Sequence, residues 1–137
     1  MKIKLERVND AVHFRATNPD GLTIDIDGSA EVGGENLGMR PMQAFLSAMV
    51  SCSSIDIVTI LKKMRQEVTN FRVDVEGLRV DEHPKVFHTI HLHFFIGGQV
   101  KEERAHRAIE LSLTKYCSVS MMLKESVKVD YTLTLEP

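Results

Sequence analysis

The sequence predicts a single α+β domain that spans residues 1–137. Three observations support this fold class: segments in which apolar and polar residues alternate lie at both ends of the chain, a long apolar segment with helical spacing follows the first group, and an amphipathic segment precedes the last. A chain of 137 residues with 43% hydrophobic and 26% charged residues has the size and balance of one globular domain. The predicted element order is βββ-α-ββ-α-α-β.

The first three strands are expected over residues 2–8, 12–17 and 22–28, where side chains alternate with a period of two. Turn signals separate them. Asn9-Asp10 is a short hairpin signal, and Asn18-Pro19-Asp20-Gly21 combines a fixed φ with a residue that tolerates positive φ. We therefore expect an antiparallel meander that ends before Gly33-Gly34.

A long helix is predicted from Pro41 to about residue 64, because Pro41 suits the first helical turn and the apolar residues after it follow helical spacing. Asp56 is the only charged residue between positions 41 and 61, so the helix is expected to be buried on nearly every side. One chain of this size has too little surface to cover it, which predicts an obligate homodimer. A membrane span is disfavoured, because the segment carries seven polar side chains that lipid could not satisfy.

The second half of the chain predicts two strands, two helices and a final strand. The strands cover residues 71–80 and 86–96 around the turn Asp81-Glu82-His83-Pro84, and an amphipathic helix covers residues 101–115. A brief helix is expected to start near Cys117, where serines can cap it. Alternation over residues 127–135 predicts the last strand.

Composition disfavours several classes of function. The net charge of −2 is spread along the chain, so there is no basic stripe for nucleic acid. The N-terminus alternates like a strand and does not resemble a signal peptide, and two cysteines without an export signal indicate a reducing compartment. We therefore expect a cytoplasmic protein. His91 and His93 share a strand face, but no third ligand is evident, so neither a metal nor a cofactor is assigned.

Any chemistry is expected at the only two cysteines, Cys52 and Cys117, which lie 65 positions apart. Free cysteines are usually buried and inert, and neither residue belongs to a Cys-x-x-Cys pair. A reactive role therefore needs support from their context.

Two segments supply that context. The first contains residues 38–46, Gly-Met-Arg-Pro-Met-Gln-Ala-Phe-Leu, and residues 51–58, Ser-Cys-Ser-Ser-Ile-Asp-Ile-Val. This region resembles the central helix of the OsmC/Ohr family of thiol peroxidases. Residues 117–120, Cys-Ser-Val-Ser, resemble the second motif of that family, usually Cys-Pro-Val-Ser. The predicted element order also matches the family's fold across essentially the whole chain.

The resemblance implies an intertwined homodimer that reduces hydroperoxides. Cys52 would attack the hydroperoxide, Cys117 would resolve the product as a disulfide, and a dithiol reductant would restore the pair. Two cysteines suffice for this cycle, so it needs no cofactor.

A reactive thiol needs a group that lowers its pKa, and Arg40 is the leading candidate, with the hydroxyls of Ser51, Ser53 and Ser120 as alternatives. The family pairs an arginine with a glutamate near the start of the central helix, whereas this chain has Met42 and Gln43 there. Gln43 can hydrogen-bond in a supporting role but has no charge to hold a guanidinium.

Asp56 lies one helical turn after Cys52, and a carboxylate there would raise a thiol pKa, so we interpret Asp56 as structural. Two functions stay open. The chain is either a thiol-dependent hydroperoxide reductase, or a non-catalytic dimeric protein that binds a small apolar ligand and has idle thiols.

Overall fold

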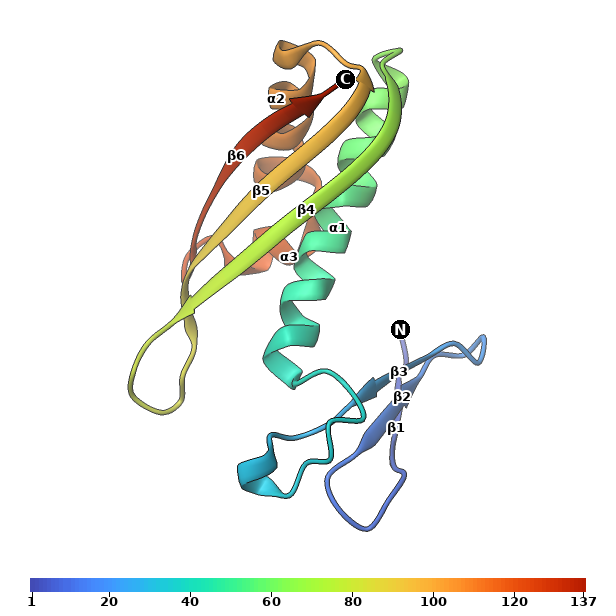
Figure 1. The fold of residues 1–137 in the computed structure, drawn as a ribbon, viewed down its shortest axis with the longest axis vertical. Helices are drawn as coiled ribbons and strands as arrows, with labels where there is room; N and C mark the ends of the chain where they lie inside the picture. Colours follow the sequence, from blue (N-terminus) through green and yellow to red (C-terminus); the bar gives the residue numbers. More distant parts are fainter. The chain divides into compact units, whose positions relative to one another are not determined.

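The computed structural model describes residues 1–137 and forms two compact units, Met1–Ser47 and Ala48–Pro137. The elements follow the predicted order of strands and helices (Figure 1), and the mixed α+β fold class is confirmed. The prediction of one domain over residues 1–137 stays a prediction.

The first unit contains the predicted meander. Strands β1 (Lys4–Arg7), β2 (Phe14–Thr17) and β3 (Thr23–Ile26) form an antiparallel sheet in the order β1-β2-β3. The Asn18 side chain accepts hydrogen bonds from the backbone N–H groups of Asp20 and Leu22 and so shapes the turn between β2 and β3. A single 3₁₀ turn, η1 (Ala30–Val32), follows the sheet and was not predicted.

Helix α1 (Pro41–Lys63) begins in the first unit and continues into the second. Gln43 Oε1 accepts a hydrogen bond from the backbone N–H of Arg40 at 3.0 Å, which is the glutamine half of a capping box, and Pro41 occupies the first helical position. At the other end Arg65 adopts a left-handed conformation, φ 57°, and the Gln66 N–H donates to the carbonyl of Leu61 at 2.9 Å. Both ends of α1 therefore match their predicted positions within one residue.

Within a single chain α1 buries one face. Every fourth residue from Met49 to Leu61 is buried, namely Met49, Ser53, Ile57 and Leu61. Apolar residues on another face stay open, since Ile55 is 69% and Val58 is 40% exposed. By length and composition α1 could cross a membrane, but the core helices of soluble proteins share this property, so one such helix is weak support for a span.

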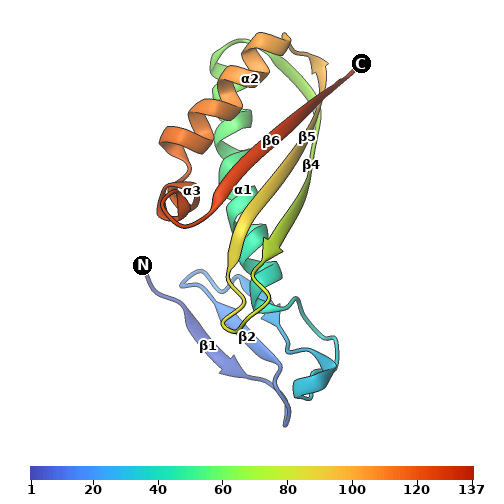
Figure 2. The same ribbon diagram turned by 90° about the vertical axis from the view of Figure 1, so that its left-hand side faces the viewer.

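The second unit is a three-stranded sheet covered by helices. Strands β4 (Glu67–Arg79), β5 (Phe87–Gln99) and β6 (Lys128–Glu136) lie in the order β4-β5-β6, with β4 antiparallel and β6 parallel to β5. The crossover from β5 to β6 contains α2 (Glu102–Leu111), the π-helical segment η2 (Ser112–Tyr116) and α3 (Ser118–Leu123). Figure 2 shows α2, α3 and this unit's part of α1 on one face of the sheet.

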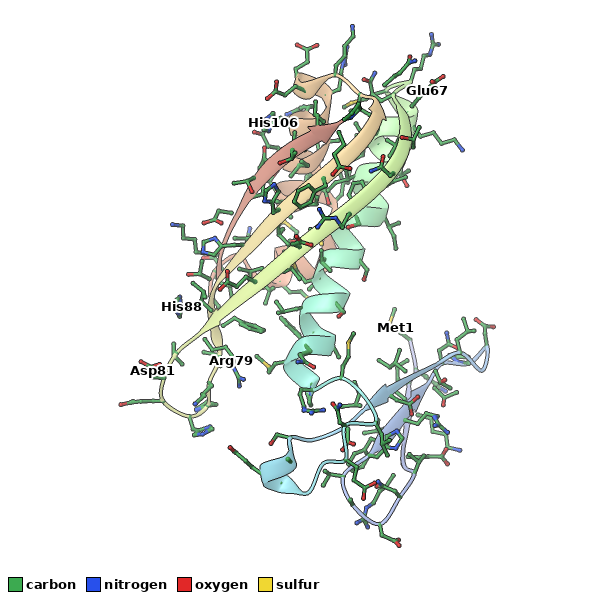
Figure 3. The ribbon with its side chains drawn as sticks, in the orientation of Figure 1. Met1, Glu67, Arg79, Asp81, His88 and His106 are labelled. Carbon is green, nitrogen blue, oxygen red and sulfur yellow. The ribbon has the colours of Figure 1, made fainter.

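The core lies between that face and the helices. Along β5 the buried residues are Ile90, Leu92, Phe94 and Ile96. The Phe94 ring meets the rings of Phe71 and Tyr131 edge-on, at centroid distances of 6.0 and 6.1 Å. Alternate positions carry His91 and His93, which point away from the core. Figure 3 places Glu67 at one end of the sheet and Arg79 and Asp81 at the hairpin end.

Candidate functional site

The two cysteines meet in the second unit, although they lie far apart in the sequence. Cys52 is on α1 and Cys117 directly precedes α3. Their Sγ atoms and a carboxylate oxygen of Asp56 all lie within 4.8 Å of one another, and both thiols are free. The structure thus brings together the two residues that the sequence singles out for chemistry.

Cys117 is held by the segments on either side of it. Its N–H donates to the Ser112 carbonyl at 2.8 Å and closes the π-helical turn, while its extended backbone makes it the N-cap of α3. The Ser120 N–H donates to Cys117 Sγ at 3.4 Å. The sulfur also lies 4.0 Å from the Met49 carbonyl of α1, so the thiol faces the helix that carries Cys52.

The two thiols differ in environment. Cys117 is fully buried and Cys52 is half-buried. Burial raises the pKa of the Cys117 thiol above its ordinary value; Ser120 opposes this effect and the neighbouring Cys52 adds to it. The Ser120 hydroxyl lies close enough to favour the thiolate but completes no hydrogen bond of good geometry, so the N–H contact is the firmer of the two.

Asp56 is anchored by a residue that the sequence analysis missed. The buried Ser112 hydroxyl lies 3.2 Å from Asp56 Oδ2 and 3.2 Å from the Ser53 carbonyl, and it can donate to either. This agrees with the structural interpretation of Asp56, but the carboxylate also lies beside both sulfurs. Ser112 occurs in an ordinary amphipathic helical pattern, so the sequence carries no signal for it.

A groove of about 380 Å³ lies beside this cluster, and Asp56 forms part of its wall. The other lining residues include Thr59, Lys63, Leu111 and Tyr116. The groove therefore reaches the cluster at Asp56, and neither cysteine lines it.

Two of the three serine hydroxyls proposed as thiol activators donate hydrogen bonds to backbone carbonyls of α1. The Ser51 hydroxyl donates to the Ala48 carbonyl at 3.1 Å, and the Ser53 hydroxyl donates to the Val50 carbonyl at 3.0 Å. Ser120 hydrogen-bonds a cysteine sulfur, and it uses its backbone N–H to do so.

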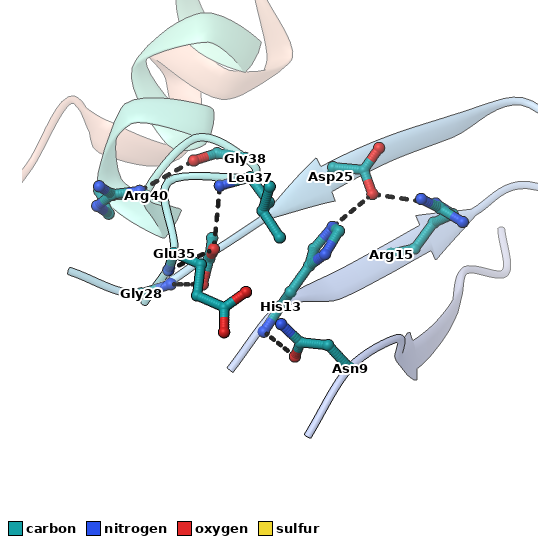
Figure 4. A network of polar contacts seen from close by, with 10 residues as sticks. Asn9, His13, Arg15, Asp25, Gly28, Glu35, Leu37, Gly38 and Arg40 are labelled. Carbon is teal, nitrogen blue, oxygen red and sulfur yellow. Dashed lines mark hydrogen bonds and ion pairs between the residues drawn. The ribbon is translucent and has the colours of Figure 1, made fainter. Parts of the chain in front are cut away.

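Arg40 and Gln43 belong to the first unit, and Figure 4 shows Arg40 beside Gly38. The Arg40 guanidinium donates to the Gly38 carbonyl at 2.9 Å and to Asn36 Oδ1 at 3.3 Å. The Gln43 side chain caps α1 through the Arg40 backbone N–H. The roles of Arg40 and Gln43 at the thiols stay predictions.

A buried carboxylate organises the loop that leads to Arg40. Asp27 is 1% exposed, and its carboxylate accepts hydrogen bonds from the N–H groups of Gly28, Glu35 and Leu37 at 2.8, 3.0 and 3.1 Å. The hydrogen bond from Leu37 is the largest of the effects that hold the pKa of Asp27 below its ordinary value. Figure 4 shows these bonds beside a second cluster in which Asp25 contacts His13 and Arg15.

The two strand histidines bond to different partners. His91 pairs with Asp130, and His93 Nε2 lies 2.8 Å from Thr134 Oγ1. Their rings therefore do not converge on one point.

The second unit is a sheet covered by helices, and it brings together two free thiols that lie 65 positions apart in the sequence. These features define the class of the protein as an α+β dithiol protein. Residues 33–132, which include both cysteines, match the family model described as OsmC-like protein. The chain belongs to the OsmC/Ohr family.

Known relatives cover nearly the whole chain. Protein YhfA of Escherichia coli K12 is 41% identical over 124 residues, 90% of each chain. A hypothetical protein from Aquifex aeolicus is 33% identical, with a TM-score of 0.83 over 99% of this chain and 97% of that one. An organic hydroperoxide resistance protein from Legionella pneumophila is 18% identical, with a TM-score of 0.72 over 98% of this chain and 97% of that one, and so shares the fold.

Proposed function

We propose that the protein is a thiol-dependent reductase of organic hydroperoxides that cycles between a dithiol and a disulfide. The observation that carries this proposal is the approach of its only two cysteine sulfurs, Cys52 and Cys117, to within 4.8 Å. The side chains have to close by less than about 3 Å to reach the S–S bond length of about 2.05 Å.

The reaction has two steps. A Cys52 thiolate attacks the distal oxygen of the hydroperoxide, the O–O bond breaks, and the alkoxide leaves with a proton as an alcohol, so that Cys52 becomes a sulfenic acid. The Cys117 thiol then condenses with the sulfenic acid, a disulfide forms and water leaves. An external dithiol returns both cysteines to thiols and is itself oxidised.

The environments of the two thiols support this division of roles. A nucleophile has to meet a substrate from solution, and Cys52 is the more exposed of the pair. Cys117 is fully buried with a raised pKa, which suits a thiol that reacts only with its neighbour. The name of the Legionella relative agrees with a hydroperoxide as substrate.

Arg40 is proposed as the cation that favours the Cys52 thiolate, with Gln43 in support through the cap of α1. The family's glutamate is replaced in this chain, so turnover is expected to be slower than in members that have the arginine–glutamate pair. The protein is proposed to act as a homodimer, because apolar residues of α1 such as Ile55 and Val58 stay exposed in one chain. It is proposed to act in the cytoplasm, because free thiols persist in a reducing compartment.

The test treats reduced protein with one equivalent of cumene hydroperoxide in metal-free buffer. We expect a Cys52–Cys117 disulfide by mass spectrometry and loss of both free thiols. Cys117→Ser should instead accumulate a sulfenic acid that dimedone traps at Cys52, and Cys52→Ser should consume no hydroperoxide.

Thr114→Ala serves as the control, because Thr114 is exposed on η2 and its hydroxyl donates to the Glu110 carbonyl one turn earlier, at the end of α2. It should behave as the wild type does. Two thiols that survive excess hydroperoxide unchanged would overturn the proposal and favour the non-catalytic, ligand-binding alternative.

A further inference from the structure

We propose that the reduced protein binds one Zn²⁺ ion per chain through Cys52, Cys117 and Asp56. No spacing in the sequence suggests this site, because the third ligand comes from a different element. Only the fold places two sulfurs and a carboxylate oxygen within 4.8 Å of one another.

The separations are close to those that zinc needs. With Zn–S bonds of about 2.3 Å and Zn–O bonds of about 2.1 Å at tetrahedral angles, ligand atoms lie roughly 3.5 to 3.8 Å apart. Each pair in the cluster therefore has to close by at most about 1.3 Å, which small rotations of side chains can supply.

The chelating pair on α1 has a favourable spacing. Cys52 and Asp56 are one turn apart, and residues at i and i+4 of a helix point to the same side. Helical metalloprotease sites use the same spacing to hold zinc with two histidines. Cys117 supplies the third ligand from the start of α3.

Outer contacts already orient two of the three ligands. The Ser112 hydroxyl lies 3.2 Å from Asp56 Oδ2, and the Ser120 N–H donates to Cys117 Sγ. Hydrogen bonds of this kind fix metal ligands in place and stabilise thiolates. Both supporting residues are buried, so water does not compete with them.

Charge and access also favour a cation. Two thiolates and a carboxylate carry three negative charges in a cluster that is buried at Cys117 and half-buried at Cys52 and Asp56, and a divalent ion offsets most of this charge. The groove gives an ion a path from solvent to the Asp56 carboxylate, and it has room for a water molecule, which could serve as fourth ligand there. Lys63 lines the same groove, and its long side chain can keep its charge in solvent.

Zinc binding would regulate the dithiol, a consequence that rests on the proposed function. Each thiol loses its proton when it binds the metal, so bound zinc withholds both sulfurs from a hydroperoxide. Conversely, oxidation converts the zinc dithiolate, one hydroperoxide and two protons into a disulfide, an alcohol, water and free Zn²⁺.

The test uses Co²⁺ as a spectroscopic probe for the zinc site. Co²⁺ titrated into the reduced full-length protein under anaerobic conditions should give sulfur-to-cobalt charge-transfer absorption that saturates at one equivalent per chain and disappears when Zn²⁺ is added. Cys52→Ser and Cys117→Ser should each weaken this absorption and the affinity strongly. Asp56→Asn should keep the sulfur absorption but lower the affinity by at least about 10-fold to 100-fold, the loss that follows mutation of even an outer-shell partner of a metal ligand.

Asp74→Asn is the matched control, because it removes an exposed aspartate from β4 and should leave binding unchanged. Thermal melts check that each variant folds without metal, and only proteins with all three ligands should gain a large increase in Tm from Zn²⁺. Cobalt binding without sulfur absorption, or with equal affinity in Cys52→Ser or Asp56→Asn, would overturn the proposal. That failure would leave the hydroperoxide reaction untouched, because the reaction is measured in metal-free buffer.

Discussion

Cys52 and Cys117 share a site but not an environment. Their approach could not be derived from spacing, because 65 positions separate them and no local motif links them. It was expected only from the resemblance of two short segments to a known family. The unequal burial of the two thiols, in contrast, depends on how α1 and α3 pack, which no sequence pattern reports.

The sequence does not predict that the Asp27 side chain is buried and accepts backbone hydrogen bonds. In the sequence it is one of the polar residues, with Thr23 and Asp25, that alternate with leucine and isoleucine, so it reads as a solvent-facing strand residue. The strand ends at Ile26, and the carboxylate turns inward to accept three backbone N–H groups from the following loop. Such a role depends on where the loop returns.

Asp27→Asn is therefore expected to destabilise the protein and to flatten its acid dependence. Hydrogen bonds hold the Asp27 pKa below its ordinary value of 3.8, so the carboxylate contributes stability above that pH and loses it as the pH falls through the lower, folded-state pKa. The wild type should lose unfolding free energy below about pH 4 more steeply than Asp27→Asn does.

Urea unfolding between neutral and acidic pH measures this difference. Asp20→Asn is the control, since Asp20 is exposed in a turn and should change neither the stability nor its acid dependence. Parallel pH profiles for the wild type and Asp27→Asn would contradict the prediction.

The elements with strong periodicity were predicted well. Helix α1 and strand β6 lie within one residue of their expected bounds. The predicted helix over residues 101–115 is wrong at its C-terminal end, because α2 stops at Leu111 and the chain continues as a π-helical turn. Apolar spacing persists through that turn, so the pattern does not reveal it. The parallel pairing of β5 with β6 was also not predicted, since it depends on the crossover between them.

The π-helical segment matters because it directs Ser112 toward α1. Ser112→Ala removes the hydroxyl beside Asp56 Oδ2 and the Ser53 carbonyl. We expect a loss of about 1–2 kcal/mol in unfolding free energy, because a buried acceptor then lacks its donor. Chemical denaturation of the reduced protein measures it.

Thr114→Ala tests the same segment at an exposed position, where its hydroxyl bonds the Glu110 carbonyl. Its effect should be within about 0.5 kcal/mol. Equal losses for the two variants would mean that general disturbance of η2, not the contact with α1, is responsible.

At the scale of the whole molecule, one face of α1 carries apolar residues that a single chain leaves exposed to solvent. Ile55→Asp places a charge on that face without disturbing the packing of the single chain, because Ile55 is 69% exposed. If the face is buried in a homodimer, the variant should be a folded monomer, whereas the wild type sediments as a dimer.

Met122→Asp provides the comparison, since Met122 is an apolar residue of α3 that is 85% exposed. It should leave the dimer intact. A wild type that sediments as a monomer would contradict the proposed assembly.

A disulfide between Cys52 and Cys117, as proposed, would also restrict the motion of the unfolded chain. Cys52 precedes β4 and Cys117 follows α2, so a disulfide would close a covalent ring that contains the β4–β5 hairpin and the first crossover helix. A ring of this length restricts the unfolded chain by about 4 kcal/mol in the loop-entropy model. The redox state of two side chains would thus change the stability of the second unit, although α3 and β6 lie outside the ring.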